Sequence, residues 1–140
     1  MIGILLVTHN GLGDSFVDCV RHVLGEVPPN LKVLTVLADD DPQLKLVEGQ
    51  ALIKQLDTGG GVLILADVFG ATPSNIARQL CHAERVTGVA GVNLPMLLRT
   101  ACSSGKTLPE LAKIAVEGGR ECIVYIDSEG CDAATRCADR

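Results

Sequence analysis

The amino-acid sequence predicts an α/β fold: a doubly wound, mainly parallel sheet of four strands with helices on both faces. Two features lead to this prediction. Short apolar runs without polar alternation recur along the chain, as expected of strands that are buried on both faces. Each run is followed by a glycine-rich or polar turn and then by a helix-length segment, which is the order of right-handed βα units. The 140 residues suffice for one such domain but not for two.

The first apolar run covers residues 2–8 and ends on His9. Residues 10–13, Asn-Gly-Leu-Gly, tolerate left-handed backbone and therefore indicate a turn. Asp14 or Ser15 is then expected to cap a helix that begins close behind them. A strand, a turn and a helix start thus follow directly on one another.

The second strand is expected over residues 31–37, after a loop that two prolines enforce over residues 27–30. Three consecutive aspartates, residues 39–41, precede Pro42 and place carboxylates at the positive end of a second helix over residues 42–56. The same aspartates could bind a divalent cation. Capping fits better, because no further carboxylate nearby completes an oxygen ligand set.

The third unit repeats the pattern of the first. Glycines 59–61 end the second helix, and residues 62–66 form a third apolar strand. Asp67 terminates this strand, as a histidine terminates the first. Thr72 is expected to cap the third helix, which has a proline in its first turn and an end near residue 83.

The remaining expected elements are a fourth strand over residues 86–92, a short helix over 93–103, a last helix over 108–117 and a fifth strand over 122–127. Gly118 and Gly119 are expected to end the last helix. The fifth strand can join the sheet in parallel, at an edge or in an exchanged position. Residues 1–127 are therefore expected to form the domain, with residues 128–140 as a polar C-terminal tail that frays.

Composition and charge exclude several classes of function. The net charge is -5, only 2% of residues are aromatic and no basic cluster occurs, so nucleic-acid binding is not expected. No apolar run is long enough to span a membrane, and no basic region precedes the first one, which predicts a cytoplasmic protein without a signal peptide. The six cysteines form no C-x-x-C pair and are interpreted as reduced thiols packed as small apolar residues.

His9 and Asp67 are the candidate catalytic residues. If the first and third strands are neighbours, as in flavodoxin-like sheets, both side chains emerge at the carboxyl edge, where open parallel sheets bind ligands. A carboxylate that accepts a hydrogen bond from one imidazole nitrogen leaves the other nitrogen as a nucleophile. Taken singly, each residue also fits a structural role at a strand end or in a turn. The pair together favours nucleophilic chemistry.

Groups that suit a bound phosphoryl group lie near this pair along the chain. The expected phosphoryl-binding residues are Thr8, Asn10, Gly11, Gly70, Thr72 and Ser74. The amino terminus of the helix after Thr72 adds a partial positive charge. Neither a metal nor a cofactor is expected in this site.

Three segments carry a resemblance to a known family. They read Met-Ile-Gly-Ile-Leu-Leu-Val-Thr-His over residues 1–9, Asp-Val-Phe-Gly-Ala-Thr-Pro-Ser-Asn over residues 67–75, and Gly-Val-Asn-Leu-Pro-Met-Leu-Leu over residues 91–98. They resemble the signatures of the mannose-family IIA component of the phosphoenolpyruvate-dependent sugar phosphotransferase system. The resemblance covers about residues 1–127, and three motifs in the right order are more specific than any one alone.

The resemblance implies that His9 accepts a phosphoryl group from the histidine phosphocarrier protein and passes it to a IIB component, in sugar uptake or as a regulatory IIA. It also implies that Asp67 hydrogen-bonds His9, that Thr72 and Ser74 border the phosphoryl site, and that homodimers exchange the last strand. Asn10 departs from the family, which often has glycine directly after the histidine.

Two related families are alternatives. A response-regulator receiver, a signalling module, also has an aspartate after its third strand. It needs an acidic pair for magnesium where Thr8 and His9 stand, and a lysine where Asp127 and Ser128 stand. The dihydroxyacetone-kinase phosphotransfer subunit resembles this chain in its amino-terminal histidine and its fold, but the segment 67–75 favours the mannose type.

Overall fold

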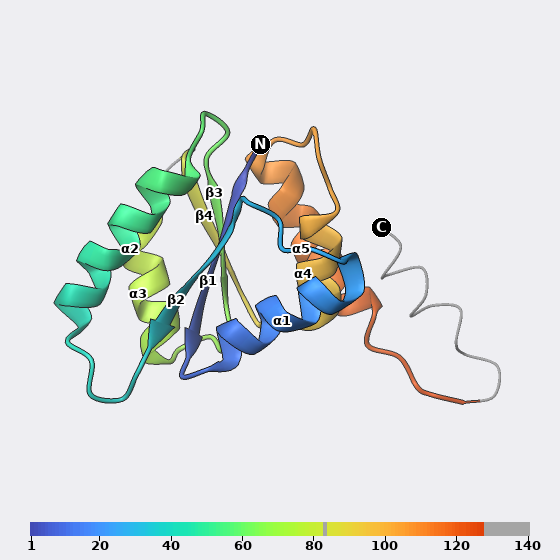
Figure 1. Cartoon of the computed structure of the whole chain (residues 1–140), viewed down its shortest axis with the longest axis horizontal. Coiled ribbons are helices and arrows are strands. Elements are labelled where there is room, and N and C mark those ends of the chain that lie inside the picture. Colours follow the sequence, from blue (N-terminus) through green and yellow to red (C-terminus); the bar gives the residue numbers. More distant parts are fainter. Residues whose placement is uncertain (83, 128–140) are drawn as a thin grey trace.

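The computed structural model describes residues 1–82 and 84–127, and it confirms a parallel sheet of four strands in the order β2-β1-β3-β4 (Figure 1). The strands are β1 (Gly3–His9), β2 (Leu31–Val36), β3 (Val62–Ala66) and β4 (Val86–Ala90). This is the flavodoxin-like order, in which β1 and β3 are adjacent. The adjacency on which the site prediction depends is therefore present.

Within the described residues, five helices cover the two faces of the sheet (Figure 1). They are α1 (Leu12–Leu24), α2 (Pro42–Leu56), α3 (Thr72–Leu80), α4 (Leu94–Ala101) and α5 (Leu108–Glu121). Figure 1 shows α2 and α3 on one face, and α1, α4 and α5 on the other. Because successive strand residues point to opposite faces, Leu5 and Val7 join one core cluster, and Ile4 and Leu6 join the other.

Local capping signals place several helix starts as predicted. The Asp41 side chain accepts a hydrogen bond from the backbone N–H of Gln43 at 2.9 Å, and α2 has its expected bounds. Asn93 caps α4 in the same way through the N–H of Met96 at 2.9 Å. These caps satisfy backbone donors that a helix leaves unpaired in its first turn.

The predicted starts of α1 and α3 were wrong. Gly11 precedes α1 and Ala71 precedes α3, and neither helix has a side-chain cap, so Asp14 and Thr72 lie inside the helices that they were expected to cap. The reason at α1 is close packing, because a Cβ atom on Gly13 would lie 2.6 Å from Thr8 Oγ1. The first turn of α1 therefore begins directly on top of β1.

The prediction that Gly118 and Gly119 end the last helix was also wrong, since α5 continues to Glu121. Both glycines are buried where α5 packs on α4. A Cβ atom on Gly118 would lie 2.8 Å from Arg99 Cδ, and one on Gly119 would lie 2.8 Å from Met96 Cε. These glycines permit a close helix–helix contact rather than a chain reversal.

Residues 122–127 form no strand in the single chain, although a fifth strand was predicted there. Among the described residues, no further strand pairs with β4 on its outer side, where Val86 makes only an isolated bridge to His82, so β4 is an edge strand. The apolar side chains of the segment are exposed, namely Ile123, Val124, Tyr125 and Ile126. A strand needs a partner edge to satisfy its backbone groups, and this segment has none within the described part of its own chain.

The cysteines follow the expectation only in part. Cys19, Cys81 and Cys102 are free thiols, but all three residues are exposed and not packed in the core as expected, and Cys122 is disulfide-bonded. Burial raises the pKa of the Cys81 thiol, although the backbone N–H of Gly88 opposes the shift. The spacing of the cysteines along the sequence did not reveal the disulfide.

Candidate phosphoryl-transfer site

His9 and Asp67 meet at the carboxyl edge of the sheet. His9 is the last residue of β1, and Asp67 directly follows β3. Asp67 Oδ2 accepts a hydrogen bond from the backbone N–H of His9 at 2.8 Å, and it lies 2.8 Å from His9 Nδ1. The same carboxylate oxygen therefore holds both the backbone and the ring of the histidine.

The two side chains differ in their exposure to solvent. The side chain of Asp67 is 5% exposed, whereas that of His9 is 47% exposed. Burial raises the pKa of Asp67, but hydrogen bonds from the backbone N–H and ring of His9 and from the backbone N–H of Val68 outweigh it. The resulting pKa lies below the ordinary value of 3.8, so the carboxylate is ionised at neutral pH.

The ionised carboxylate determines the tautomer of the histidine. A carboxylate without a proton can only accept a hydrogen bond, so Nδ1 must donate at the 2.8 Å contact. The neutral ring then carries its free lone pair on Nε2. The arrangement can present Nε2 as a nucleophile on a half-exposed ring.

The turn after His9 follows β1 without a spacer. Asn10 has a φ of 48°, in the left-handed region that asparagine tolerates better than most residues. Its backbone N–H donates to the carbonyl of Val36 in β2 at 3.0 Å, which fixes the turn to the sheet. Gly11 then precedes α1, whose uncapped first turn leaves backbone N–H groups at this edge.

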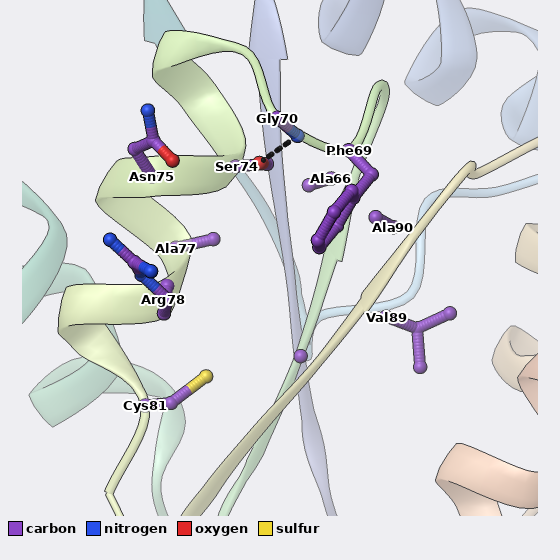
Figure 2. Close-up of a pocket in the computed structure, with 11 residues that line it drawn as sticks. Ala66, Phe69, Gly70, Ser74, Asn75, Ala77, Arg78, Cys81, Val89 and Ala90 are labelled. Carbon is purple, nitrogen blue, oxygen red and sulfur yellow. Dashed lines mark hydrogen bonds between the residues drawn. The ribbon is translucent and has the colours of Figure 1, made fainter.

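The loop after Asp67 is held by its own hydrogen bond. The N–H of Gly70 donates to Ser74 Oγ at 2.8 Å, as Figure 2 shows. Gly70 has a φ of 88°, which favours glycine. Thr72 is exposed in the first turn of α3. The Ser74 hydroxyl thus accepts a hydrogen bond from Gly70, and its own O–H remains available to donate to another acceptor.

Thr8 takes a different place from the other predicted phosphoryl-binding residues. Its side chain is fully buried, and its hydroxyl makes no hydrogen bond within the described part of the chain. It faces Gly13 in the first turn of α1. Thr8 therefore lies beneath the turn and does not present its hydroxyl at the surface.

The sequence-based prediction missed the apolar side chains at this edge. Phe69 is 86% exposed and borders a cavity of about 300 Å³ between α3 and β4 (Figure 2). Small residues, among them Ala77, Gly88 and Ala90, leave room for this cavity. Val68 and Phe69 form an apolar pair in a loop of otherwise mostly small or polar residues. This pair was the signal in the sequence from which exposed apolar side chains at this edge could have been predicted.

Two of the three consecutive aspartates, Asp40 and Asp41, have local structural roles. Asp40 Oδ2 accepts a hydrogen bond from the backbone N–H of Leu37 at 2.6 Å, and Asp41 caps α2. Within residues 1–82 and 84–127, no group of three or more His, Cys, Asp or Glu residues could hold a metal ion. No helix in the same residues has both the length and the apolar character needed to cross a membrane.

Comparison with known proteins supports the resemblance seen in the sequence. The family model described as "PTS system fructose IIA component" matches residues 3–116. The mannose-specific EIIAB component of Escherichia coli K12 is 32% identical over 123 residues, which are 86% of this chain. The fructose-specific EIIA component of Bacillus subtilis is 28% identical over 99 residues, which are 70% of this chain and 67% of that protein.

Solved structures agree with these matches. The mannose/sorbose-specific IIA subunit from Enterococcus faecalis has a TM-score of 0.79 and 26% identity, and the similarity covers 90% of this chain and 95% of that one. The chain spans only 38% of the length of the E. coli relative. These findings give no support to the dihydroxyacetone-kinase or receiver alternatives. The chain therefore belongs to the family of mannose- and fructose-type IIA components of the phosphotransferase system.

Proposed function

We propose that this chain is a phosphocarrier in which Nε2 of His9 accepts a phosphoryl group from the histidine phosphocarrier protein and passes it to a IIB component. The observation that carries the proposal is the 2.8 Å contact between His9 Nδ1 and Asp67 Oδ2. In the transfer, the Nε2 lone pair forms a bond to phosphorus while the donor's N–P bond breaks. The electron pair of that bond returns to the donor's ring nitrogen.

The surrounding groups have distinct proposed roles. His9 is the catalytic residue, and Asp67 is a positioning residue that acts through the His9 ring. Uncapped N–H groups at the start of α1, next to Asn10 and Gly11, suit the phosphoryl oxygens. The hydroxyls of Thr72 and Ser74 are the proposed donors from the other loop, and the Gly70 amide holds the Ser74 hydroxyl in place. Thr8 supports the turn from below.

The labelling experiment uses phosphoenolpyruvate together with the purified general phosphotransferase proteins. The chain should acquire one acid-labile, base-stable phosphoryl group, and the His9→Ala variant should acquire none. His22→Ala is the matched control, because His22 is exposed in α1 and should leave labelling intact. Undiminished labelling of His9→Ala would refute the proposal.

The acceptor distinguishes transport from regulation. The phosphorylated chain, freed of its donor, is mixed with a purified IIB component encoded near its gene. Rapid loss of label to IIB supports a role in sugar uptake. Stable retention of the label supports a regulatory IIA that senses the phosphorylation state. We place the protein in the cytoplasm, where phosphoenolpyruvate is made.

We further propose that residues 1–127 act as one domain and assemble as a homodimer. The open edge of β4 and the exposed apolar side chains of residues 123–126 support this proposal. A second copy would satisfy both by pairing its segment 122–127 with β4. Light scattering of the full-length chain at micromolar concentration should give a dimer, and truncation after Glu121 should abolish it. A full-length monomer would contradict the proposal. Residues 128–140 lie outside the described part of the chain.

A further inference from the structure

The cavity of about 300 Å³ between α3 and β4 is not needed for the proposed phosphoryl transfer. Small residues from three elements form its walls, namely Ala66, Ala77, Gly88 and Ala90. Ala77 points from α3 toward β4 (Figure 2), and Gly88 and Ala90 share one face of β4 because alternate strand residues lie on the same side. The volume is at the lower end of the range found for small-molecule sites. The cavity can therefore hold a small ligand.

The polar groups of this cavity favour an anion. Among the described residues that line it, Arg78 is the only one with a charge. Arg78 is exposed, and it takes part in none of the ion pairs between described residues. Ser74 and Asn75 lie about one turn earlier in α3 and can donate hydrogen bonds from a hydroxyl and an amide. A guanidinium group matches the two oxygens of a carboxylate, so a carboxylate at the mouth of the cavity fits these donors.

The cavity shares residues with the loop beside His9. Phe69 and Gly70 border the cavity, and they follow Asp67, which holds the His9 ring. Ser74 also lines the cavity, and its O–H is a proposed donor to the phosphoryl group. A ligand that accepts this O–H withdraws it from the phosphoryl group, and the ligand's negative charge repels the phosphoryl oxygens. Occupation of the cavity by an anion should therefore slow the phosphorylation of His9.

We propose that this cavity binds a small organic carboxylate, and that the bound carboxylate slows the phosphorylation of His9. The apolar body of the ligand would lie between α3 and β4, with its carboxylate at Arg78 and Ser74. The effect on the rate rests on the proposed phosphocarrier function, whereas the binding does not. In the proposed homodimer, the partner's segment would extend the sheet beyond the outer edge of β4, so it would border the cavity without replacing its walls.

Two probes of similar size test the charge preference of the cavity. They are benzoate, an aromatic carboxylate, and benzyl alcohol, its neutral counterpart. The methyl NMR signals of Ala66 and Ala90 in the full-length chain should shift with benzoate and saturate with a Kd of about 1 mM or tighter. Arg78→Gln should weaken benzoate binding about threefold or more and change benzyl alcohol binding by less than about twofold. Arg21→Gln makes the same change in α1, on the opposite face of the sheet, and should affect neither probe.

Two variants test the location of the binding by filling the cavity from opposite walls. Ala77→Leu and Ala90→Leu should each weaken the binding of both probes about 10-fold or more, because a larger side chain occupies the space. Ala51→Leu adds the same group to the exposed surface of α2 and should leave binding unchanged. Thermal unfolding identifies the variants that are folded, and one folded wall variant suffices for the test.

A free thiol in the cavity wall gives an independent measure of occupancy. Cys81 lines the cavity and points toward β4 (Figure 2), whereas Cys19 is exposed on α1. Benzoate should slow the alkylation of Cys81 by iodoacetamide, followed by peptide mass mapping, and leave the alkylation of Cys19 unchanged. At saturating benzoate, phosphorylation of His9 by the histidine phosphocarrier protein should slow about twofold or more, and Ala77→Leu should remove this inhibition.

The outcomes separate this inference from the proposed function. If His9 is never labelled, the phosphocarrier function is wrong, and the NMR titration still decides whether the cavity binds benzoate. Absence of benzoate binding, as when a partner's side chain fills the cavity, would overturn the inference. Equal binding to the unmodified chain and to the folded wall variants would overturn it as well, because the probe would then bind elsewhere. Binding without any change in the phosphorylation rate would overturn the regulatory part.

Discussion

Replacing Asp67 with asparagine removes the charge that orients His9 while preserving the shape of the side chain. The carboxylate accepts three hydrogen bonds, two at Oδ2 from His9 and one at Oδ1 from the N–H of Val68. An asparagine amide has only one oxygen, and its NH₂ group donates. That NH₂ group would therefore face an N–H donor, either of His9 or of Val68. The side chain at this position is only 5% exposed, so water cannot easily relieve this conflict.

The structure sets the size of the expected effects of Asp67→Asn. Loss of a charge-assisted hydrogen bond at a nearly buried site should lower the free energy of unfolding by about 1.5–3 kcal/mol at neutral pH. If the amide NH₂ faces Nδ1, the ring proton moves to Nε2 and the nucleophilic lone pair is lost from that nitrogen. Phosphorylation of His9 should therefore slow by about 10- to 1,000-fold without vanishing.

The pH dependence provides a second check on Asp67. Its pKa in the folded protein lies below 3.8, so its contribution to stability is fully present above that pH and is lost as the pH falls through the lower folded value. The stability difference between the original chain and Asp67→Asn should thus shrink as the pH falls to about 3.

Urea unfolding measures the change in the free energy of unfolding, a quenched time course measures the phosphorylation rate, and ¹⁵N NMR reports the tautomer of the His9 ring. Asp18→Asn is the control, because Asp18 is 74% exposed and its ion pair with Arg21 should contribute less than about 1 kcal/mol. An unchanged ring tautomer and an unchanged phosphorylation rate in Asp67→Asn would refute the positioning role of Asp67.

Three further substitutions test the fold around the site, with urea unfolding as the measurement. Gly3→Ala should destabilise the chain by about 1–3 kcal/mol, because the new Cβ atom would lie 2.6 Å from Leu56 Cβ and 3.0 Å from its carbonyl oxygen; a neutral result would mean that β1 can move freely from α2. Asn10→Val should cost about 1–2 kcal/mol at a φ of 48°, whereas Asn10→Gly should be neutral or stabilising; equal stabilities would show that the turn is not left-handed. Thr107→Ala should cost about 1 kcal/mol by removing the capping box with Glu110, and an unchanged stability would contradict that cap.

The sequence predicted those features that depend on neighbouring residues. Short, mainly apolar runs bounded by turn residues placed all four strands of the sheet, and the Asp41 cap placed α2, because both signals act within a few residues. Gly118 and Gly119 were misinterpreted because their role depends on Arg99 and Met96, which lie on another helix. The segment 122–127 was expected as a strand because it is a short apolar run, but a strand also requires a partner edge, and the described part of the chain provides none.

The candidate site shows the same division. The pairing of His9 with Asp67 follows from the order of the strands, which the sequence does not reveal and which the prediction assumed as a condition. The enclosed hydroxyl of Thr8 could not be foreseen, because it depends on how closely Gly13 approaches β1. The exposure of Phe69 depends on the path of its loop beside α3 and β4.

The hydrogen bond that holds His9 continues the pattern of bonds between β1 and β3. The β1–β3 ladder pairs Val7 with Ala66 and ends there. Beyond it, the next donor on this side, the N–H of His9, is accepted by the side chain of Asp67 in place of a backbone carbonyl. Because the same oxygen also holds the His9 ring, the orientation of the nucleophile depends on the register of two buried strands.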